Sequence, residues 1–289
     1  MFKLEKFMDK RVLKSTLLED FDVSAFFTTR DLPLKYGERE DLKEEIENNK
    51  KLLCEGLNIP LGNLIIPIQT HSDNIEVIFD PSPRPSPPRG EGAINSPFEN
   101  TDALITNLPN IAIALNFADC VPIIFYDPVK KVIAVAHAGW KGTASKIAQK
   151  TVEKMVNEFS ISPKDVIALI GPAIGRCCFE VEKDVLEKIL KTVAHDKISL
   201  VLDYRQFGKA WFSSLGRAGA LRATALLPKS ANMRIDLKLV NKFQLLASGV
   251  EKIDLCEDCT CCKNDLFFSY RKEKGNTQRH SAVAMLSDE

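Results

Sequence analysis

The sequence predicts a single α+β domain spanning residues 1–289, with mixed sheets, and three observations lead to this prediction. Apolar strand-like runs alternate with amphipathic helix-like segments along the whole chain, and hairpins occur as well as helical crossovers. Neither an internal repeat nor a linker divides the chain into two halves. Two unusual loops, about 81–98 and about 203–232, account for roughly 50 residues, which leaves a core of the size typical of one domain.

In the first part of the chain, short strands surround one predicted helix. Apolar residues at helical spacing in a Glu- and Lys-rich segment indicate a helix over 38–57. The segment 81–98, PSPRPSPPRGEGAINSPF, is too rich in proline to join a sheet and is expected to be an extended, poorly ordered loop. Strands are predicted at 12–18, 23–29, 64–69, 74–79 and 111–116.

The second part begins with a hairpin and continues with alternating helices and strands. Ile147, Thr151, Met155 and Val156 give the segment 143–159 the apolar stripe of an amphipathic helix. The segment 203–232 fits neither period and is interpreted as an irregular insertion. The remaining predictions are hairpin strands at 120–126 and 131–137, strands at 166–170, near 253 and at 281–286, and helices ending near 192 and covering 235–246.

Composition excludes several classes of protein. Lys and Arg total 39, as do Asp and Glu, so the strong basic excess of a nucleic-acid-binding protein is absent. The longest apolar run falls short of the 18 residues expected of a transmembrane helix. The charged N-terminus lacks the apolar core of a signal peptide, so a cytoplasmic location is expected, without membrane association. Oligomeric state leaves no signal in the sequence.

The hairpin at 120–137 brings together a cysteine and a histidine. The Asp127-Pro128 pair is typical of a turn. A hairpin centred between Pro128 and Val129 pairs Cys120 with His137 on one face, with Cβ atoms roughly 4.5–5.5 Å apart. That distance suits a Cys–His dyad or two ligands of one metal, although buried packing of both residues is the alternative. A longer turn that shifted the register by one would turn the two side chains to opposite faces.

His71 is the best candidate for a third member of this site. It follows an apolar strand and lies in a polar turn with Gln69 and Ser72. Together with Cys120 and His137 it would make a Cys-His₂ set, the three-ligand arrangement of a catalytic rather than a structural zinc. Zinc with an open position activates water at neutral pH. A second interpretation is a cysteine hydrolase in which Cys120 is the nucleophile and His137 the base.

The other cysteines and histidines give weaker signals. The CxxCxCC run from Cys256 to Cys262 could bind zinc or an iron–sulfur cluster, but no second CxxC pair completes a Cys₄ site. Inert thiols are therefore the favoured interpretation there, and Cys177-Cys178 is interpreted as buried packing. A four-copper oxidase needs on the order of ten imidazole ligands, which four histidines cannot supply.

Basic residues near the predicted site suit an anion. Arginine forks bind phosphate or carboxylate, and Arg271 follows an aromatic segment that should direct it towards the site. Lys141 follows the glycine–tryptophan turn after His137. Solvated surface charge is the more fitting interpretation for Arg279 than for Arg271.

Seven motifs in this sequence resemble those of the YfiH family, which has been described as multicopper polyphenol oxidase or laccase and includes the mammalian protein FAMIN. The run ADCxP…HAGWxG is highly specific, and the matches cover almost the whole chain outside the two insertions. The matching stretches are FTTR (27–30), QTHS (69–72), TDALIT (101–106), ADCVPI (118–123), AVAHAGWKGT (134–143), IGPAIGRCCFEV (170–181) and LFFSYRKEKGNTQR (266–279).

The resemblance implies a fold, a metal and an activity. The fold is a layered α/β/β/α sandwich of the type shared with CNF-like cysteine hydrolases. The metal is zinc, held by His71, Cys120 and His137, with copper as an adventitious alternative. The activity is phosphorolysis of adenosine, inosine and methylthioadenosine, together with deamination of adenosine, so the partners are a small nucleoside and phosphate. Some bacterial members are instead linked to editing of peptidoglycan precursors, and polyphenol oxidation is disfavoured.

The expected site follows from both arguments. Asp119 or Asp102 could transfer protons, and the sequence does not decide between them. The catalytic candidates are His71, Cys120, His137 and Asp119, and the substrate-binding candidates are Arg271, Lys141, Gln69 and Asn116.

Overall fold

The computed structural model describes residues 1–36, 39–79, 98–203, 233–275 and 277–288. Apart from residues 98 and 203, both predicted insertions lie outside these ranges.

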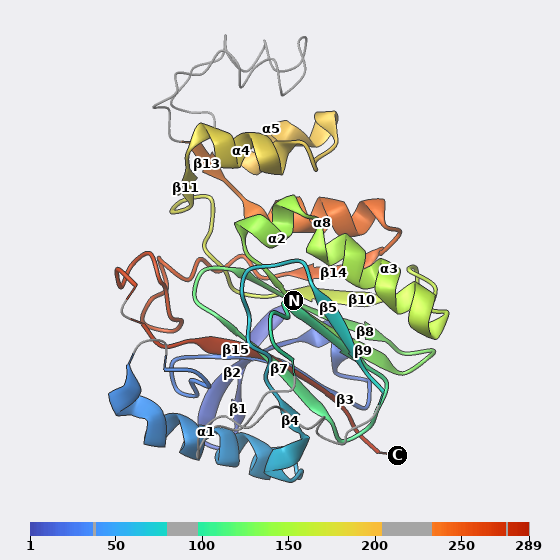
Figure 1. The fold of residues 1–289 in the computed structure, drawn as a ribbon, viewed down its shortest axis with the longest axis vertical. Helices are drawn as coiled ribbons and strands as arrows, with labels where there is room; N and C mark the ends of the chain where they lie inside the picture. Colours follow the sequence, from blue (N-terminus) through green and yellow to red (C-terminus); the bar gives the residue numbers. More distant parts are fainter. Residues whose placement is uncertain (37–38, 80–97, 204–232, 276, 289) are drawn as a thin grey trace.

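Two sheets packed face to face form the middle of the molecule (Figure 1). In spatial order, the first contains β1 (Phe2–Phe7), β2 (Lys10–Ser15), β3 (Val23–Thr28), β15 (His280–Leu286), β7 (Ala112–Phe117) and β4 (Leu64–Ile65). The second contains β14 (Lys252–Leu255), β10 (Ile167–Ile170), β8 (Val121–Asp127), β9 (Val132–Ala138), β6 (Ala103–Thr106) and β5 (Ile75–Ile78).

Helices cover the outer faces of both sheets. The first sheet carries α1 (Lys43–Gly56), and the second carries α2 (Trp140–Ala144), α3 (Ile147–Phe159) and α8 (Leu237–Ala247) (Figure 1). The α/β/β/α layering and the mixed α+β class are thus as predicted. A small sheet of β11 (Glu180–Val181), β13 (Met233–Ile235) and β12 (Leu202–Asp203) accompanies α4 (Lys183–Leu190) and α5 (Ile198–Val201).

Each interface between layers has its own apolar core. Phe27, Leu115 and Ile124 are among the buried residues between the two sheets. Phe26 and Leu53 belong to the core under α1, whose polar face reaches solvent. The strands at the centre of each sheet are buried on both faces, which is why they read as continuous apolar runs rather than alternating ones.

The central hairpin differs in register from the prediction. Its turn contains four residues, 128–131, so Pro122 rather than Cys120 lies opposite His137. Proline disfavours the tight primed turns of a two-residue hairpin, and the longer loop relieves this conflict. The shift is by two residues, so the period of two keeps Cys120 and His137 on the same face.

Several predicted boundaries are wrong for local reasons. Lys146 adopts a left-handed backbone (φ 60°), which divides the predicted helix 143–159 into α2 and α3. Pro67 follows closely after β4, so the strand predicted at 64–69 keeps only two residues. Asp236 caps α8 through a bond from the Leu239 amide, and the residues before it form β13 instead of helix.

The ends of the predicted first strand also change. Strand β2 begins at Lys10 and stops at Ser15, whose hydroxyl accepts a bond from the Leu17 amide and caps a short 3₁₀ turn. Strand β1 is missing from the sequence-based prediction, although it pairs with β2 along its whole length.

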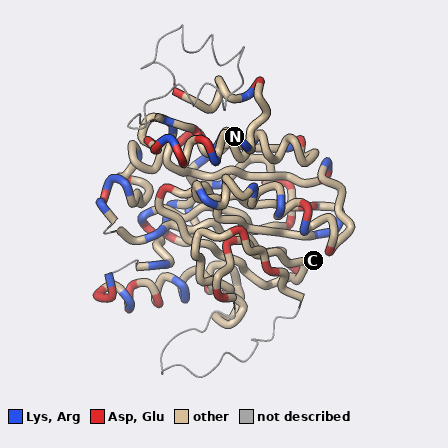
Figure 2. Tube along the Cα trace, turned by 45° about the horizontal axis from the view of Figure 1, so that its top comes forward, with Lys and Arg blue, Asp and Glu red and all other residues tan. Residues whose placement is uncertain are grey.

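Charge is mixed over the surface. Figure 2 shows Lys and Arg interspersed with Asp and Glu along the described chain, in keeping with the zero net charge. Within the described ranges, every helix is too short or too polar to span a bilayer.

Candidate metal centre and active site

Three side chains from separate segments meet at one end of the second sheet. Cys120 immediately precedes β8, His137 lies near the end of β9, and His71 lies in the loop between β4 and β5. One ligand atom of each residue lies within 4.8 Å of the other two. The imidazole rings of His71 and His137 are 4.9 Å apart between centroids. The structure therefore brings together the three residues that the sequence predicts as metal ligands, the trio of His71, Cys120 and His137.

Gly139 makes this close approach possible. A Cβ atom at this position would lie 3.1 Å from the Cys120 sulfur and 3.2 Å from Cδ2 of His71. Both distances are shorter than an ordinary van der Waals contact, so any larger residue would displace a member of the trio. The close packing of Cys120 and His71 thus requires a glycine at position 139.

A buried carboxylate fixes two members of the trio. Asp102 is fully buried, and its Oδ1 accepts bonds from His137 Nδ1 (2.7 Å) and from the His71 amide (3.1 Å). Its Oδ2 accepts bonds from the amides of Thr70 (3.2 Å) and Ser72 (2.6 Å) and from the Ser72 hydroxyl (2.6 Å). Burial would raise the pKa of Asp102, but hydrogen bonds from His137 and Ser72 outweigh it and lower the pKa to about 2. These contacts make Asp102 a positioning residue.

The contact with Asp102 also decides which nitrogen of His137 faces the site. Since Nδ1 donates to the carboxylate, Nε2 is left to accept or to bind a metal. A carboxylate–histidine pair of this kind is the usual outer partner of a zinc ligand. With one thiol and two imidazoles, the donor set fits a zinc ion.

Cys120 and His137 also shift each other's pKa. Burial alone would raise the pKa of the Cys120 thiol, but the charge of His137 and hydrogen bonds from both histidines lower it to about 6. Burial would lower the pKa of His137, yet the facing Cys120 sulfur and Asp102 raise it. Each group favours the charged form of the other, so the thiolate is readily available as a ligand or nucleophile.

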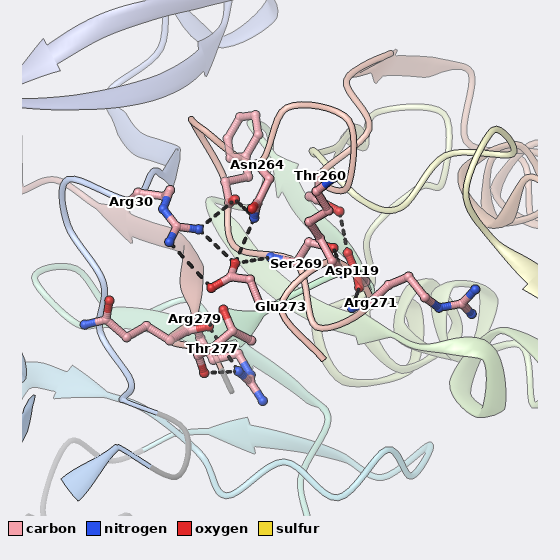
Figure 3. A network of polar contacts seen from close by, with 12 residues as sticks. Arg30, Asp119, Thr260, Asn264, Ser269, Arg271, Glu273, Thr277 and Arg279 are labelled. Atoms are coloured by element: carbon pink, nitrogen blue, oxygen red, sulfur yellow. Dashed lines mark hydrogen bonds and ion pairs between the residues drawn. The ribbon is translucent and has the colours of Figure 1, made fainter. Parts of the chain in front are cut away.

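Asp119 is held beside Cys120 by a second network (Figure 3). Its Oδ1 accepts a bond from the Thr260 hydroxyl and its Oδ2 one from the Arg271 amide, each at 2.7 Å. Asp119 (φ 88°) and His71 (φ 62°) both have left-handed backbones, which few non-glycine residues adopt.

The relative exposure of Arg271 and Arg279 is the reverse of the prediction. The exposed Arg271 guanidinium donates to the carbonyl oxygens of Cys178 and Glu180, and Figure 3 shows it directed away from Arg279. Arg279 is only partly exposed, and burial lowers its pKa while the Cys120 thiolate opposes this effect. The expectation that Arg279 is the more solvated of the two is therefore wrong.

The amides of Gln69 and Asn116 are engaged with the protein itself. Gln69 Nε2 donates to the main-chain carbonyl oxygen of Asn116, and Gln69 Oε1 accepts a bond from the main-chain amide of Asn116. The Asn116 side chain accepts a bond from the Ser281 hydroxyl. These contacts join the His71 loop to the first sheet, and a role in substrate binding stays a prediction for both residues.

An open cleft of about 550 Å³ begins at His71. Its lining includes the indole of Trp140 and three basic side chains, those of Lys141, Lys188 and Lys191. The two lysines from different elements, Lys141 and Lys188, each place an ammonium 5.8 Å from the Trp140 ring. The cleft therefore offers an aromatic face and positive charge next to His71, the one member of the trio in its lining.

A family model described as multi-copper polyphenol oxidoreductase laccase matches residues 27–287. The chain belongs to this family. It is the YfiH family expected from the motifs, and the solved structure of YlmD from Geobacillus stearothermophilus has the same fold, with a TM-score of 0.79 and 29% identity over 99% of both chains.

Curated members of the YfiH family are named as enzymes of purine metabolism. A purine nucleoside phosphorylase of Bacteroides thetaiotaomicron is 32% identical in an alignment of 276 positions, which covers 91% of this chain and 92% of the relative. Adenosine deaminase RL5, from an unknown prokaryotic organism, is 32% identical in an alignment of 229 positions, which covers 78% of this chain and 76% of the relative.

Proposed function

We propose that this chain is a zinc-dependent purine nucleoside phosphorylase that acts on adenosine, inosine and methylthioadenosine and also deaminates adenosine. The observation that carries the proposal is the convergence of His71, Cys120 and His137, two of them anchored by Asp102. The names of the relatives support the choice of substrate class.

Zinc suits the site better than a copper array does. His71, Cys120 and His137 would hold the ion and leave a position open, where it would supply Lewis acidity to the reacting centre. The remaining histidines do not contribute imidazoles to it. His195 is exposed at the start of a 3₁₀ turn, and His280 is buried among Phe117, Phe267 and Phe268.

The cleft would bind the nucleoside and phosphate. The Trp140 indole offers a face on which a purine can stack, and Lys141, Lys188 and Lys191 offer charge for phosphate. In phosphorolysis, a phosphate oxygen bonds to C1′ of the ribose while the N-glycosidic bond breaks, which yields ribose 1-phosphate and the free purine. In deamination, water adds at C6 of adenine and ammonia leaves.

Asp102 and Asp119 would have different roles. Asp102 orients His137 and the His71 loop, and its five hydrogen bonds leave it unsuited to exchange protons. Asp119 is adjacent to Cys120 and remains our candidate for proton transfer to the leaving base or from the attacking water. Lys141 lines the cleft, so we propose it as the first phosphate contact. Arg271 fixes Asp119 through its main-chain amide, and it would serve as a second contact by moving its guanidinium from the carbonyl oxygens of Cys178 and Glu180 to phosphate.

The test is a product assay on protein of measured zinc content, with adenosine in the presence and absence of phosphate. Phosphate-dependent adenine and phosphate-independent inosine are expected, and Cys120→Ala should abolish both. Cys54→Ala is the matched control, because Cys54 is a buried thiol in the core under α1. Activity that persists after Cys120→Ala has lost its zinc would remove the metal from the mechanism.

A cysteine hydrolase is the second candidate, favoured by the lowered pKa of Cys120 beside His137. In this case the thiolate would attack an amide carbon, and His137 would donate a proton to the leaving amine. Peptidoglycan precursors are the substrate class to test. A covalent adduct on Cys120 trapped in metal-free protein during turnover would favour this alternative.

A further inference from the structure

Four other cysteines form a second cluster outside the trio. Cys177 and Cys178 lie in the loop after β10, and Cys259 and Cys262 lie in the loop after β14. All four sulfurs lie within 4.8 Å of one another, and Cys262 Sγ is 3.5 Å from the sulfurs of both Cys177 and Cys178. The interpretation of Cys177-Cys178 as buried packing is therefore wrong, since Cys177 is exposed and both thiols face the CxxC pair.

The fold brings these two loops together. β10 and β14 are adjacent parallel strands, so the loops that follow them leave the sheet at the same end. Ala173 and Cys259 continue the pairing as an isolated bridge beyond the strands. The Thr260 amide donates to the Ala173 carbonyl oxygen at 3.1 Å. The juxtaposition of the cysteines therefore rests on main-chain contacts.

The spacing of the sulfurs fits one tetrahedral ion. With a zinc–sulfur bond of about 2.3 Å, the sulfurs of a tetrahedral site lie about 3.8 Å apart. The observed separations, from 3.5 Å to less than 4.8 Å, bracket this value. In an iron–sulfur cluster the four thiolates bind to two or four different irons. Their sulfurs therefore lie farther apart than the sulfurs around a single ion. A disulfide would need sulfurs about 2.05 Å apart and would use only two of the four.

The main chain around Cys259 also suits a thiolate ligand. The Gly175 amide donates to Cys259 Sγ at 3.2 Å. Such N–H···S bonds stabilise the charged form of a metal ligand. A Cβ atom on Gly175 would lie 3.3 Å from Cys177 Sγ and 3.2 Å from Cys259 Cβ, so this glycine permits the close approach.

We propose that Cys177, Cys178, Cys259 and Cys262 bind a structural zinc ion, separate from the ion proposed for the trio. With four protein ligands the site is closed to substrate. Its role would be to lock the 256–262 loop against the 171–178 loop. Thr260, inside the CxxC turn, bonds to Asp119, and Arg271 bonds both to Asp119 and to the Cys178 carbonyl oxygen. The ion would thereby fix the residues beside Cys120.

The test counts metal ions in the full chain, purified in reducing buffer without chelator. Elemental analysis should find two zinc ions per chain in the unmutated protein and one in Cys259→Ser/Cys262→Ser. Cys256→Ser is the matched control, since Cys256 is a buried thiol of the same loop that is not part of the cluster, and it should keep two. His71→Ala/Cys120→Ala should keep one, which separates this site from the proposed active-site ion.

Cobalt loading gives a second measurement that leaves all four cysteines of the cluster unmutated. Co²⁺ added to metal-free His71→Ala/Cys120→Ala should give the intense thiolate charge-transfer absorption and d–d bands of a tetrahedral four-sulfur site. Any of three results overturns the proposal: no metal in this variant, iron in place of zinc, or a disulfide among the four cysteines by mass spectrometry of the alkylated, unreduced protein. The outcome does not depend on the nucleoside activity.

Discussion

Replacing Asp102 by asparagine tests how the active site is held together. The carboxylate accepts five hydrogen bonds, two at Oδ1 and three at Oδ2, and every donor belongs either to His137 or to the loop that carries His71. An amide of the same shape has one accepting oxygen and one donating nitrogen. In either orientation, the new NH₂ group faces N–H donors.

The magnitude follows from which contacts are lost. If the amide oxygen keeps His137, the NH₂ opposes the amides of Thr70 and Ser72, and if it turns, the NH₂ opposes His137. Each charge-assisted bond is worth about 1.5–3 kcal/mol, and each buried donor left unpaired costs about 1–3 kcal/mol. We expect the free energy of unfolding to fall by about 3 kcal/mol. Loss of an outer partner of this kind weakens metal binding about 10–100-fold, or about 1.4–2.7 kcal/mol.

Asp127→Asn is the matched control. Asp127 is also fully buried, and its Oδ1 accepts bonds from the amides of Val129 and Lys130, but its Oδ2 has no hydrogen-bond partner. An amide can therefore keep both bonds, and a loss of about 1 kcal/mol is expected, with zinc affinity unchanged.

The assay has two parts. Urea unfolding gives the stability change, and competition with a chromogenic chelator gives the zinc affinity of the site that Cys120→Ala removes. If Asp102→Asn binds zinc at this site as tightly as Asp127→Asn does, then Asp102 does not position the ligands.

Three further predictions concern the same region. Gly139→Ala should lower kcat/KM at least about tenfold while the melting temperature changes little, because its Cβ would crowd Cys120 Sγ at 3.1 Å; unchanged kinetics would contradict the steric argument. Lys141→Ala should raise the KM for phosphate and leave phosphate-independent inosine formation intact, and an equal loss in both reactions would contradict a phosphate contact. Burial lowers the pKa of His280 to about 3 from 6.5, so the unfolded state binds the extra proton below pH 6.5 and stability is lost as the pH falls towards 3. Between pH 7.5 and 5.0 the unmutated protein should therefore lose about 2 kcal/mol more than His280→Phe in urea unfolding, and equal losses would show that the ring is protonated in the folded state.

Local patterns were sufficient to predict the trio. Cys120 and His137 belong to one hairpin, so the period of two decides their relative side even though the register was off by two. His71 lies in a polar turn just before β5, and the start of β5 is at the same end of the second sheet as the end of β9. The layers also follow from local signals, because the apolar stripe of α3 and the continuous apolar runs of β8 and β9 each reveal how much of the element is buried.

Features that depend on contacts between distant segments could not be predicted from the sequence. Cys177 and Cys178 lack the CxxC spacing, so nothing near them indicates that they face Cys259 and Cys262. That contact depends on the parallel pairing of β10 with β14, which are separated by more than 80 residues. The relative exposure of Arg271 and Arg279 likewise depends on how the C-terminal loop folds back over the site.

The two candidate metal sites share one mechanical problem, which is that irregular loops must hold ligands to within tenths of an ångström. The active-site loops adopt left-handed conformations at His71 and Asp119, each of which costs of order 1–3 kcal/mol for a non-glycine residue. At His71 the cost is offset by the three loop amides and the Ser72 hydroxyl that bind Asp102. At Asp119 it is offset by Thr260 and Arg271, which depend on the second loop pair (Figure 3). A tetrathiolate ion would stiffen this second pair, as the buried carboxylate stiffens the first. Strain on the two sides of Cys120 is thus balanced by different means, so disrupting the cysteine cluster should disturb Asp119 while leaving His71 and His137 bonded to Asp102.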